Sequence, residues 1–156
     1  MRYFLLISLF MITACSSTNS FIDRDIAGQV PKNVSRVIIS SPLPVDSLYS
    51  KTLKTLSSDG YSFRYRFDKA HEITTNEKYV GTNDLPATYT NLKISINVVV
   101  RSNRKGSKAI LRGQWDSGYY YGIPAKWDDG HSQVNKYAFT QLIQVAKHMK
   151  GQITYK

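Results

Sequence analysis

The densest chemical feature of the sequence is a cluster of positive charge. Five basic residues fall within twelve positions, namely Arg101, Arg104, Lys105, Lys108 and Arg112. Clustered cations attract phosphates and carboxylates, by about 1 kcal/mol per Lys or Arg near an anionic lipid surface. The cluster therefore predicts a binding surface for an anionic partner. A charged strand surface that only prevents edge-to-edge aggregation is the alternative interpretation.

Two more arginines belong to the same prediction. Arg64 and Arg66 alternate with the aromatic residues of positions 61–67, so a strand would place both arginines on one face and the aromatic residues on the other. If helices cover only the other face of the sheet, the uncovered face collects most of these cations. We expect that face or its rim to hold Arg64, Arg66, Lys93, Arg101, Lys108 and Arg112.

Aromatic residues form a second candidate surface, directly after the basic cluster. Its members are Trp115, Tyr119, Tyr120, Tyr121 and Trp127, with acidic residues nearby at positions 116, 128 and 129. Exposed Trp and Tyr side chains are typical of surfaces that bind sugars or proteins. Alternatively, Trp115 and some of the tyrosines cap the core beneath the last helix.

Catalytic signals are weak. The three histidines, His71, His131 and His148, are far apart, and neither H-E-x-x-H nor G-x-S-x-G occurs. Asp128, Asp129 and His131 approximate an acid/base or metal site, but a polar turn before a helix is sufficient to explain them. We therefore expect no enzyme, no metal and no cofactor. An envelope hydrolase that acts on glycan or peptidoglycan through Asp128, Asp129 or His131 is the alternative.

The amino terminus has the pattern of an export signal. Arg2 precedes an apolar run that ends at Ile12, which is the length of a signal-peptide core. The run is too short for a membrane-spanning helix, which needs roughly 20 residues. We expect residues 1–14 to be a signal peptide.

The run ends in Ile12-Thr13-Ala14-Cys15, which resembles the lipobox of bacterial lipoproteins. The resemblance implies cleavage before Cys15 and a covalent lipid on its sulfur, and several acyl chains anchor a protein stably. Ser16 follows where an Asp would favour the inner membrane, so the resemblance implies an outer-membrane protein that faces the periplasm. An ordinary cleaved signal or a buried N-terminal helix is the alternative.

Charge and cysteine content restrict the partners. The chain has 21 basic and 11 acidic residues, a net charge of +10, and its single cysteine excludes an internal disulfide. In the periplasm a basic protein meets phosphorylated lipids and acidic polysaccharides rather than nucleic acid. We expect attachment to the membrane through the lipid, and as partner an outer-membrane protein, an anionic lipid or an envelope polysaccharide.

The remaining sequence predicts the elements that position these residues. Residues 15–33 are polar and indicate a tether, and residues 34–156 form one domain. Hydrophobic periodicity and turn residues predict strands over 34–40, 61–68, 92–101 and 107–116, a further strand within 71–80, and helices over 45–57 and 132–150. Asp46 or Ser47 is the expected N-cap of the first helix.

Each strong strand has one apolar and one polar face, which suits a sheet covered by helices on one side. The sequence thus predicts an α+β two-layer sandwich, with a mainly antiparallel sheet of three to five strands and two helices on one face. This element order resembles outer-membrane accessory lipoproteins such as the lipopolysaccharide-assembly lipoprotein, without a shared motif. The expected function is a binding or assembly accessory factor for an envelope component; a secretion-system pilot lipoprotein is a further alternative.

Overall fold

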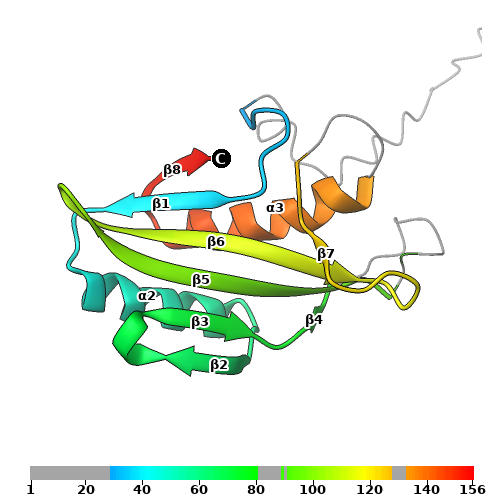
Figure 1. Ribbon diagram of the computed structural model, residues 1–156, viewed down its shortest axis with the longest axis horizontal. Coiled ribbons are helices and arrows are strands. Elements are labelled where there is room, and N and C mark those ends of the chain that lie inside the picture. Colours follow the sequence, from blue (N-terminus) through cyan, green and yellow to red (C-terminus); the bar gives the residue numbers. More distant parts are fainter. Residues whose placement is uncertain (1–28, 81–88, 90, 128–132) are drawn as a thin grey trace, which may run out of the picture.

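The computed structural model describes residues 29–80, 89, 91–127 and 133–156 (Figure 1). Its elements follow the order β1, α2, β2, a 3-10 helix at Asp68–Ala70, β3, β4, β5, β6, β7, α3 and β8. Within these residues, two α-helices and an antiparallel sheet make this an α+β fold, as predicted.

The described residues form an eight-stranded sheet with two long strands at its centre. The main path runs β2-β3-β5-β6-β1-β8, while β4 also pairs with β5 and β7 with β6, and every pair is antiparallel. The strands are β1 (Val37–Ser41), β2 (Phe63–Phe67), β3 (Glu72–Thr75), β4 (Lys78–Tyr79), β5 (Lys93–Asn103), β6 (Gly106–Asp116), β7 (Ile123–Pro124) and β8 (Gln152–Tyr155).

The prediction of three to five strands was wrong, because the extra strands are short. β4, β7 and β8 contain two to four residues each, too few for an alternating pattern to be recognised. β8 pairs with β1 and so adds an edge to the sheet after the last helix.

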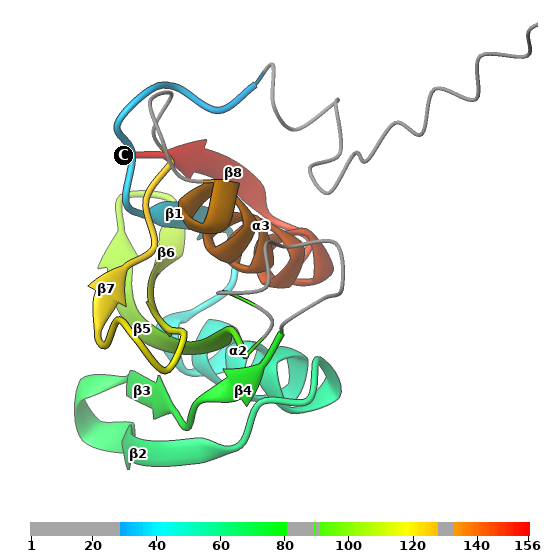
Figure 2. The same ribbon diagram turned by 90° about the vertical axis from the view of Figure 1, so that its right-hand side faces the viewer.

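Both helices lie on one face of the sheet and contact each other (Figure 2). They are α2 (Val45–Ser58) and α3 (Gln133–His148), close to the predicted ranges. The N-cap of α2 is Pro44, whose side chain makes no capping hydrogen bond. The expectation that Asp46 or Ser47 caps this helix was therefore wrong, and both residues lie within its first turn.

The core lies between the helices and the inner face of the sheet. In β5 the side chains of Ile94, Ile96, Val98 and Val100 are fully buried, and they alternate with polar or partly exposed neighbours. The corresponding positions of β6 and the apolar stripe of α3, including Leu142, complete this layer. None of the described helices packs on the opposite face of the sheet. The side chains of β5 and β6 that alternate with the buried ones therefore lie on an uncovered face.

A β-bulge in β2 changes the predicted pattern of its side chains. Phe63 pairs with Thr75, but Tyr65 pairs with Thr74, so two residues of β2 oppose one residue of β3. Tyr65 and Phe67 consequently face the uncovered side, where they are 54% and 45% exposed. The expectation of one continuous aromatic face over residues 61–67 was wrong, because the extra residue reverses the alternation.

Packing of the chain begins before the expected domain boundary at residue 34. Val30 and Val34 are buried, and Val34 forms an isolated bridge with Trp127. The C-terminal end of the predicted tether thus packs against the folded domain. Residues 15–28 lie outside the described part of the chain.

Candidate anion-binding site

A row of polar side chains crosses four strands near the turn between β5 and β6. Arg101 pairs with Lys108, Lys108 with Ser40, and Ser40 with Gln152. Cross-strand partners share a face of the sheet, and the residues next to this row are in the core, so the row lies on the uncovered face. Like charges placed directly opposite each other are destabilising, and in the pair of Arg101 and Lys108 the charge of Arg101 is compensated by an ion pair with Glu72.

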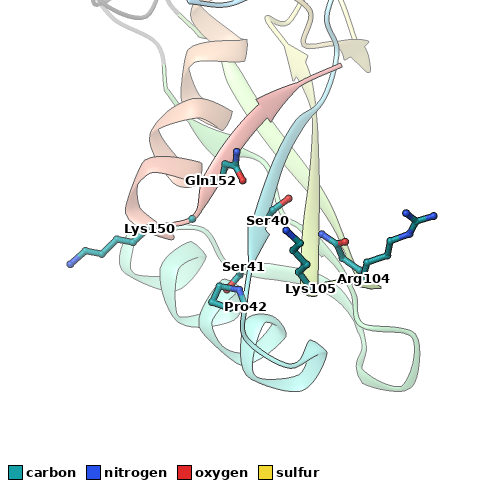
Figure 3. A pocket seen from close by; sticks show the side chains of 9 residues that line it. Ser40, Ser41, Pro42, Arg104, Lys105, Lys150 and Gln152 are labelled. Atoms are coloured by element: carbon teal, nitrogen blue, oxygen red, sulfur yellow. The ribbon is translucent and has the colours of Figure 1, made fainter.

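Beyond this row lies a hollow of about 600 Å³. Three segments line it: the β5–β6 turn, the end of β1, and the turn between α3 and β8 (Figure 3). The lining residues are Ser40, Ser41, Pro42, Asn103, Arg104, Lys105, Lys150, Gly151 and Gln152. Three of these nine residues are cationic and none is acidic, so the hollow favours an anion. We call Arg101, Arg104, Lys105, Lys108 and Lys150 the basic end.

Two glycines bring these segments together. Gly106 has φ +138°, and a Cβ atom there would lie 2.3 Å from the carbonyl oxygen of Ser41. A Cβ on Gly151 would lie 2.3 Å from a methyl carbon of Ile39. Only glycine permits backbone approach this close, so the turns that carry Lys105 and Lys150 are held directly against β1.

Hydrogen bonds fix the neighbourhood of the hollow further. The Ser107 hydroxyl donates to the carbonyl oxygen of Leu43 at 2.6 Å, which joins β6 to the segment before α2. Arg101 donates to the Glu72 carboxylate at 2.9 Å and to the carbonyl oxygen of Ala70 at 2.8 Å. The side chain of Arg101 is thus fixed in position, and Glu72 neutralises part of its charge.

The other four members keep their charge available. Arg104, Lys105 and Lys150 are exposed and Lys108 is partly exposed. Within the described ranges, none of these four side chains has an ion pair. Figure 3 shows Arg104 and Lys150 extending from opposite sides of the hollow, which makes the positive surface broad rather than a single point.

The remaining predicted cations of the uncovered face do not line this hollow. Arg112 lines a separate polar hollow of about 290 Å³ with Asn97 and other uncharged residues. Arg64 lines another, of about 530 Å³, in which Glu77 and Asp116 supply negative charge. The basic end and these two sites therefore differ in their electrostatics.

Arg66 does not share a face with Arg64, contrary to expectation. Because of the bulge, Arg66 pairs with Ile73 and lies on the helix side of the sheet. Its guanidinium donates to the Asp68 carboxylate at 3.3 Å, and the Tyr49 hydroxyl donates to the same oxygen at 2.6 Å. The hydrogen bond from Tyr49 and the charge of Arg66 hold the pKa of Asp68 below its usual value.

The aromatic residues separate into two groups. Trp115 and Trp127 are only 5% and 3% exposed, so they belong to the core rather than to a binding surface. The indole N–H of Trp115 donates to the Asn135 side chain at 2.7 Å. The three tyrosines between them, Tyr119, Tyr120 and Tyr121, are exposed on the loop before β7. The difference follows from position: Trp115 occupies an inward-facing position of β6 and Trp127 lies beside Phe139 of α3, whereas the three tyrosines lie in a loop.

The catalytic alternative depends on residues that the structure does not describe. Asp128, Asp129 and His131 lie outside the described residues. Among the described residues, no three metal-ligating side chains gather in one place. His71 and His148 each contact one carboxylate, that of Asp46 at 2.6 Å and that of Asp59 at 2.7 Å.

Sequence reasoning identified Arg101, Arg104, Lys105 and Lys108, but it missed Lys150, Ser40 and Gln152. The last two come from strand pairings that local periodicity does not reveal. Lys150 follows α3 with φ +51°, in the turn that returns the chain to β1. The only sequence signal for Lys150 was that this basic residue precedes the glycine that ends the helix.

The predicted lipidation site, Cys15, and the signal peptide precede the described residues. In the part of the chain that the structure describes, no helix has the length and apolar character needed to cross a bilayer. No protein-family model and no curated protein matches the sequence.

Proposed function

We propose that the protein is a lipoprotein, anchored in the outer membrane through Cys15, that binds an anionic component of the cell envelope through the basic end. In this proposal it is a binding or assembly accessory factor and catalyses no reaction. The acyl chains on Cys15 attach the chain to the membrane, and the folded domain presents its charged hollow in the periplasm.

The observation that carries the proposal is the composition of the hollow beside the β5–β6 turn. Arg104, Lys105 and Lys150 line it without an acidic residue, although the described chain forms ion pairs elsewhere on its surface. Ser40, Asn103 and Gln152 add groups that donate hydrogen bonds to phosphate or carboxylate oxygens. A surface that is charged only to remain solvated would not require cations from distant segments of the chain to lie around one hollow.

The anchor rests on the sequence. Ile12 to Cys15 has the lipobox pattern directly after the apolar core of a signal peptide, and the chain has no other cysteine. Two or more acyl chains give stable attachment where one chain gives only marginal binding. A membrane anchor also raises the local concentration of the domain near anionic lipids and polysaccharides, which favours binding by the basic end.

Binding to vesicles tests this function. The chain from Ser16 onward, which lacks the lipidated Cys15, is mixed with vesicles of phosphatidylcholine, with or without phosphatidylglycerol, and the bound fraction is measured by sedimentation. We expect binding only to the anionic vesicles, with loss of binding in the triple variant Arg104→Glu, Lys105→Glu, Lys150→Glu.

A second triple variant, Lys54→Glu, Lys69→Glu, Lys156→Glu, changes the net charge equally and avoids the hollow. It should retain most of the binding. Equal loss in both variants would show that net charge alone is responsible. An acidic polysaccharide in solution, used as competitor, distinguishes a lipid headgroup from a glycan as the preferred anion.

A further inference from the structure

The two polar hollows that Arg64 and Arg112 line are parts of one groove. The hollow of about 530 Å³ and the hollow of about 290 Å³ share three lining residues, Thr74, Ser95 and Gln114. The groove therefore crosses β3, β5 and β6, which are neighbours in the sheet (Figure 1). Its larger part alone has a volume within the range typical of ligand pockets. The groove shares no residue with the basic end.

Side chains that both donate and accept hydrogen bonds form the floor of this groove. Ser95 pairs with Gln114 and Thr74 with Asn97, so the four lie in two adjacent rows on the uncovered face. The Asn97 amide donates to the Thr74 hydroxyl at 3.1 Å, which leaves the hydroxyl proton of Thr74 and the side-chain oxygen of Asn97 for another partner.

The floor is accessible to a ligand. Gln114 is exposed and Ser95 is partly exposed. Within the part of the chain that the structure describes, neither side chain forms a hydrogen bond. The amide of Gln114 and the hydroxyl of Ser95 are therefore open donors and acceptors, in contrast to polar groups that are enclosed by the core.

The β-bulge in β2 adds an aromatic ring beside this floor. Tyr65 pairs with Thr74, so its side chain, 54% exposed, lies on the uncovered face at the end of the row that contains Thr74 and Asn97. A regular strand would place Arg64 opposite Thr74 and turn Tyr65 to the helix side. Bulges commonly redirect a side chain next to a functional site. Here the bulge places Arg64 in the groove and Tyr65 next to it.

The lining has no large excess of either charge. Arg64 and Arg112 supply two guanidinium groups, and Glu77 and Asp116 supply two carboxylates. Lys93, which does not line the groove, has its Nζ atom 3.8 Å from the Glu77 carboxylate. A phosphate or carboxylate ligand would therefore meet carboxylates as well as arginines, which distinguishes this groove from the basic end.

A ligand that suits this lining carries many hydroxyl groups and little charge. A hydroxyl both donates and accepts, so it can bond to carboxylates, guanidinium groups and amides alike. The C–H face of a sugar ring packs against an aromatic ring such as that of Tyr65. The outer two of the three strands are about 10 Å apart, which exceeds the width of one sugar ring. We propose that the groove across β3, β5 and β6 binds a neutral oligosaccharide of two or more sugar units.

This proposal goes beyond anion binding and does not depend on the anchor. The triple variant Arg104→Glu, Lys105→Glu, Lys150→Glu should bind the oligosaccharide as tightly as the wild type, because none of the three residues lines the groove. Added salt should have little effect on a neutral ligand, whereas it should weaken binding to anionic vesicles. The two proposals can therefore fail separately.

Isothermal titration calorimetry tests oligosaccharide binding with the full-length protein in a zwitterionic detergent that carries no sugar. The probes are maltotriose, cellotriose and chitotriose, with glucose and N-acetylglucosamine as the corresponding single units. We expect saturable binding of at least one trisaccharide, about tenfold tighter than that of its single unit, because the longer ligand contacts more of the groove. Absence of saturable binding by all three trisaccharides would overturn the proposal.

Two substitutions with matched controls locate the site. Gln114→Ala removes an exposed amide from the floor and should weaken binding about tenfold. Gln133→Ala removes an exposed glutamine of α3, on the other side of the sheet, and should leave binding unchanged. Tyr65→Ala should also weaken binding, whereas Tyr65→Phe keeps the ring and should retain it.

The unfolding temperature of each variant separates lost binding from lost folding. Gln114→Ala should unfold close to the wild type, because the side chain is exposed and forms no hydrogen bond within the described ranges. Wild-type affinity in a folded Gln114→Ala or Tyr65→Ala variant would overturn the proposal, and so would an equal loss in Gln133→Ala. If Tyr65→Ala fails to fold, Gln114→Ala decides the matter alone.

Discussion

Lys105 and Lys150 lie on two sides of one hollow, although one belongs to the β5–β6 turn and the other follows the last helix. β1 separates the two turns, and each turn is held against it by a glycine. The positive charge of the hollow is therefore a property of the tertiary structure, and substitutions that move either turn should alter binding.

Gly106→Ala should displace the turn that carries Arg104 and Lys105. The added methyl group would meet the carbonyl oxygen of Ser41, and the φ of +138° also disfavours alanine. We expect a loss of about 2–4 kcal/mol in the free energy of unfolding, from overpacking and backbone strain together. Urea denaturation measures it.

The control for this prediction is Gly118→Ala. Gly118 has φ +84°, but its Cβ position has open space. Only the cost of the left-handed conformation, about 1–2 kcal/mol, should remain. Equal destabilisation by the two substitutions would contradict the close contact between Gly106 and Ser41.

Leu142→Ala should empty a buried site between α3 and the sheet. Leu142 is fully buried and faces Gly113 of β6. Cavity formation and lost burial predict a cost of about 2–5 kcal/mol, whereas Gln133→Ala on the exposed first turn should change stability by less than ~0.5 kcal/mol. Similar unfolding midpoints for both variants would place Leu142 outside the core.

Much of this fold could be predicted because its central elements have strong periodicity. β6 alternates over all eleven of its residues and β5 over its first nine, and α2 and α3 carry continuous apolar stripes. These patterns predicted the hairpin, both helices and the uncovered sheet face. β8 has only four residues and β7 two, so pairing with a neighbour rather than local sequence determines them.

The candidate site was predictable only in part, because it too depends on strand pairing that the local sequence does not determine. Local charge density identified Arg104 and Lys105, but bringing Lys150 to them depends on β8 returning beside β1. The bulge at Arg64 moved Arg66 to the opposite face, and no residue type marks a bulge of this kind in advance. Trp115 and Trp127 entered the core because α3 covers them, which composition alone does not show.

Tyr49→Phe should raise the pKa of Asp68 towards its ordinary value of 3.8, because it removes the hydrogen bond that contributes most to the lowered value. Arg66 remains, so the return should be partial. NMR titration of the side-chain carboxyl measures the pKa. Tyr65→Phe, on the uncovered face, is the control and should leave this pKa unchanged.

The same contact predicts a dependence of stability on pH. The pKa of Asp68 is lower in the folded than in the unfolded protein, so its contribution to stability is complete above pH 3.8. It disappears as the pH falls through the folded-state pKa. Asp68→Asn should therefore lose stability less steeply on acidification than the wild type. Parallel pH profiles for the two proteins would exclude this role.

Cys15→Ser should abolish lipidation. We expect the variant to take up no radiolabelled palmitate and to appear as a soluble periplasmic product or as an uncleaved precursor. Fractionation of the envelope after labelling measures both. Palmitate incorporation and membrane retention equal to those of the wild type would refute the lipoprotein assignment.

The most direct test of the central claim is the affinity of single charge reversals for phosphatidylglycerol vesicles. If the hollow is the binding site, Lys105→Glu and Lys150→Glu should each weaken binding at least fivefold, from about 1 kcal/mol or more of lost attraction per residue. Lys54→Glu, on the exposed side of α2, should have little effect. A Lys150→Glu variant that binds as tightly as the wild type, while Lys105→Glu does not, would contradict a site assembled from both turns.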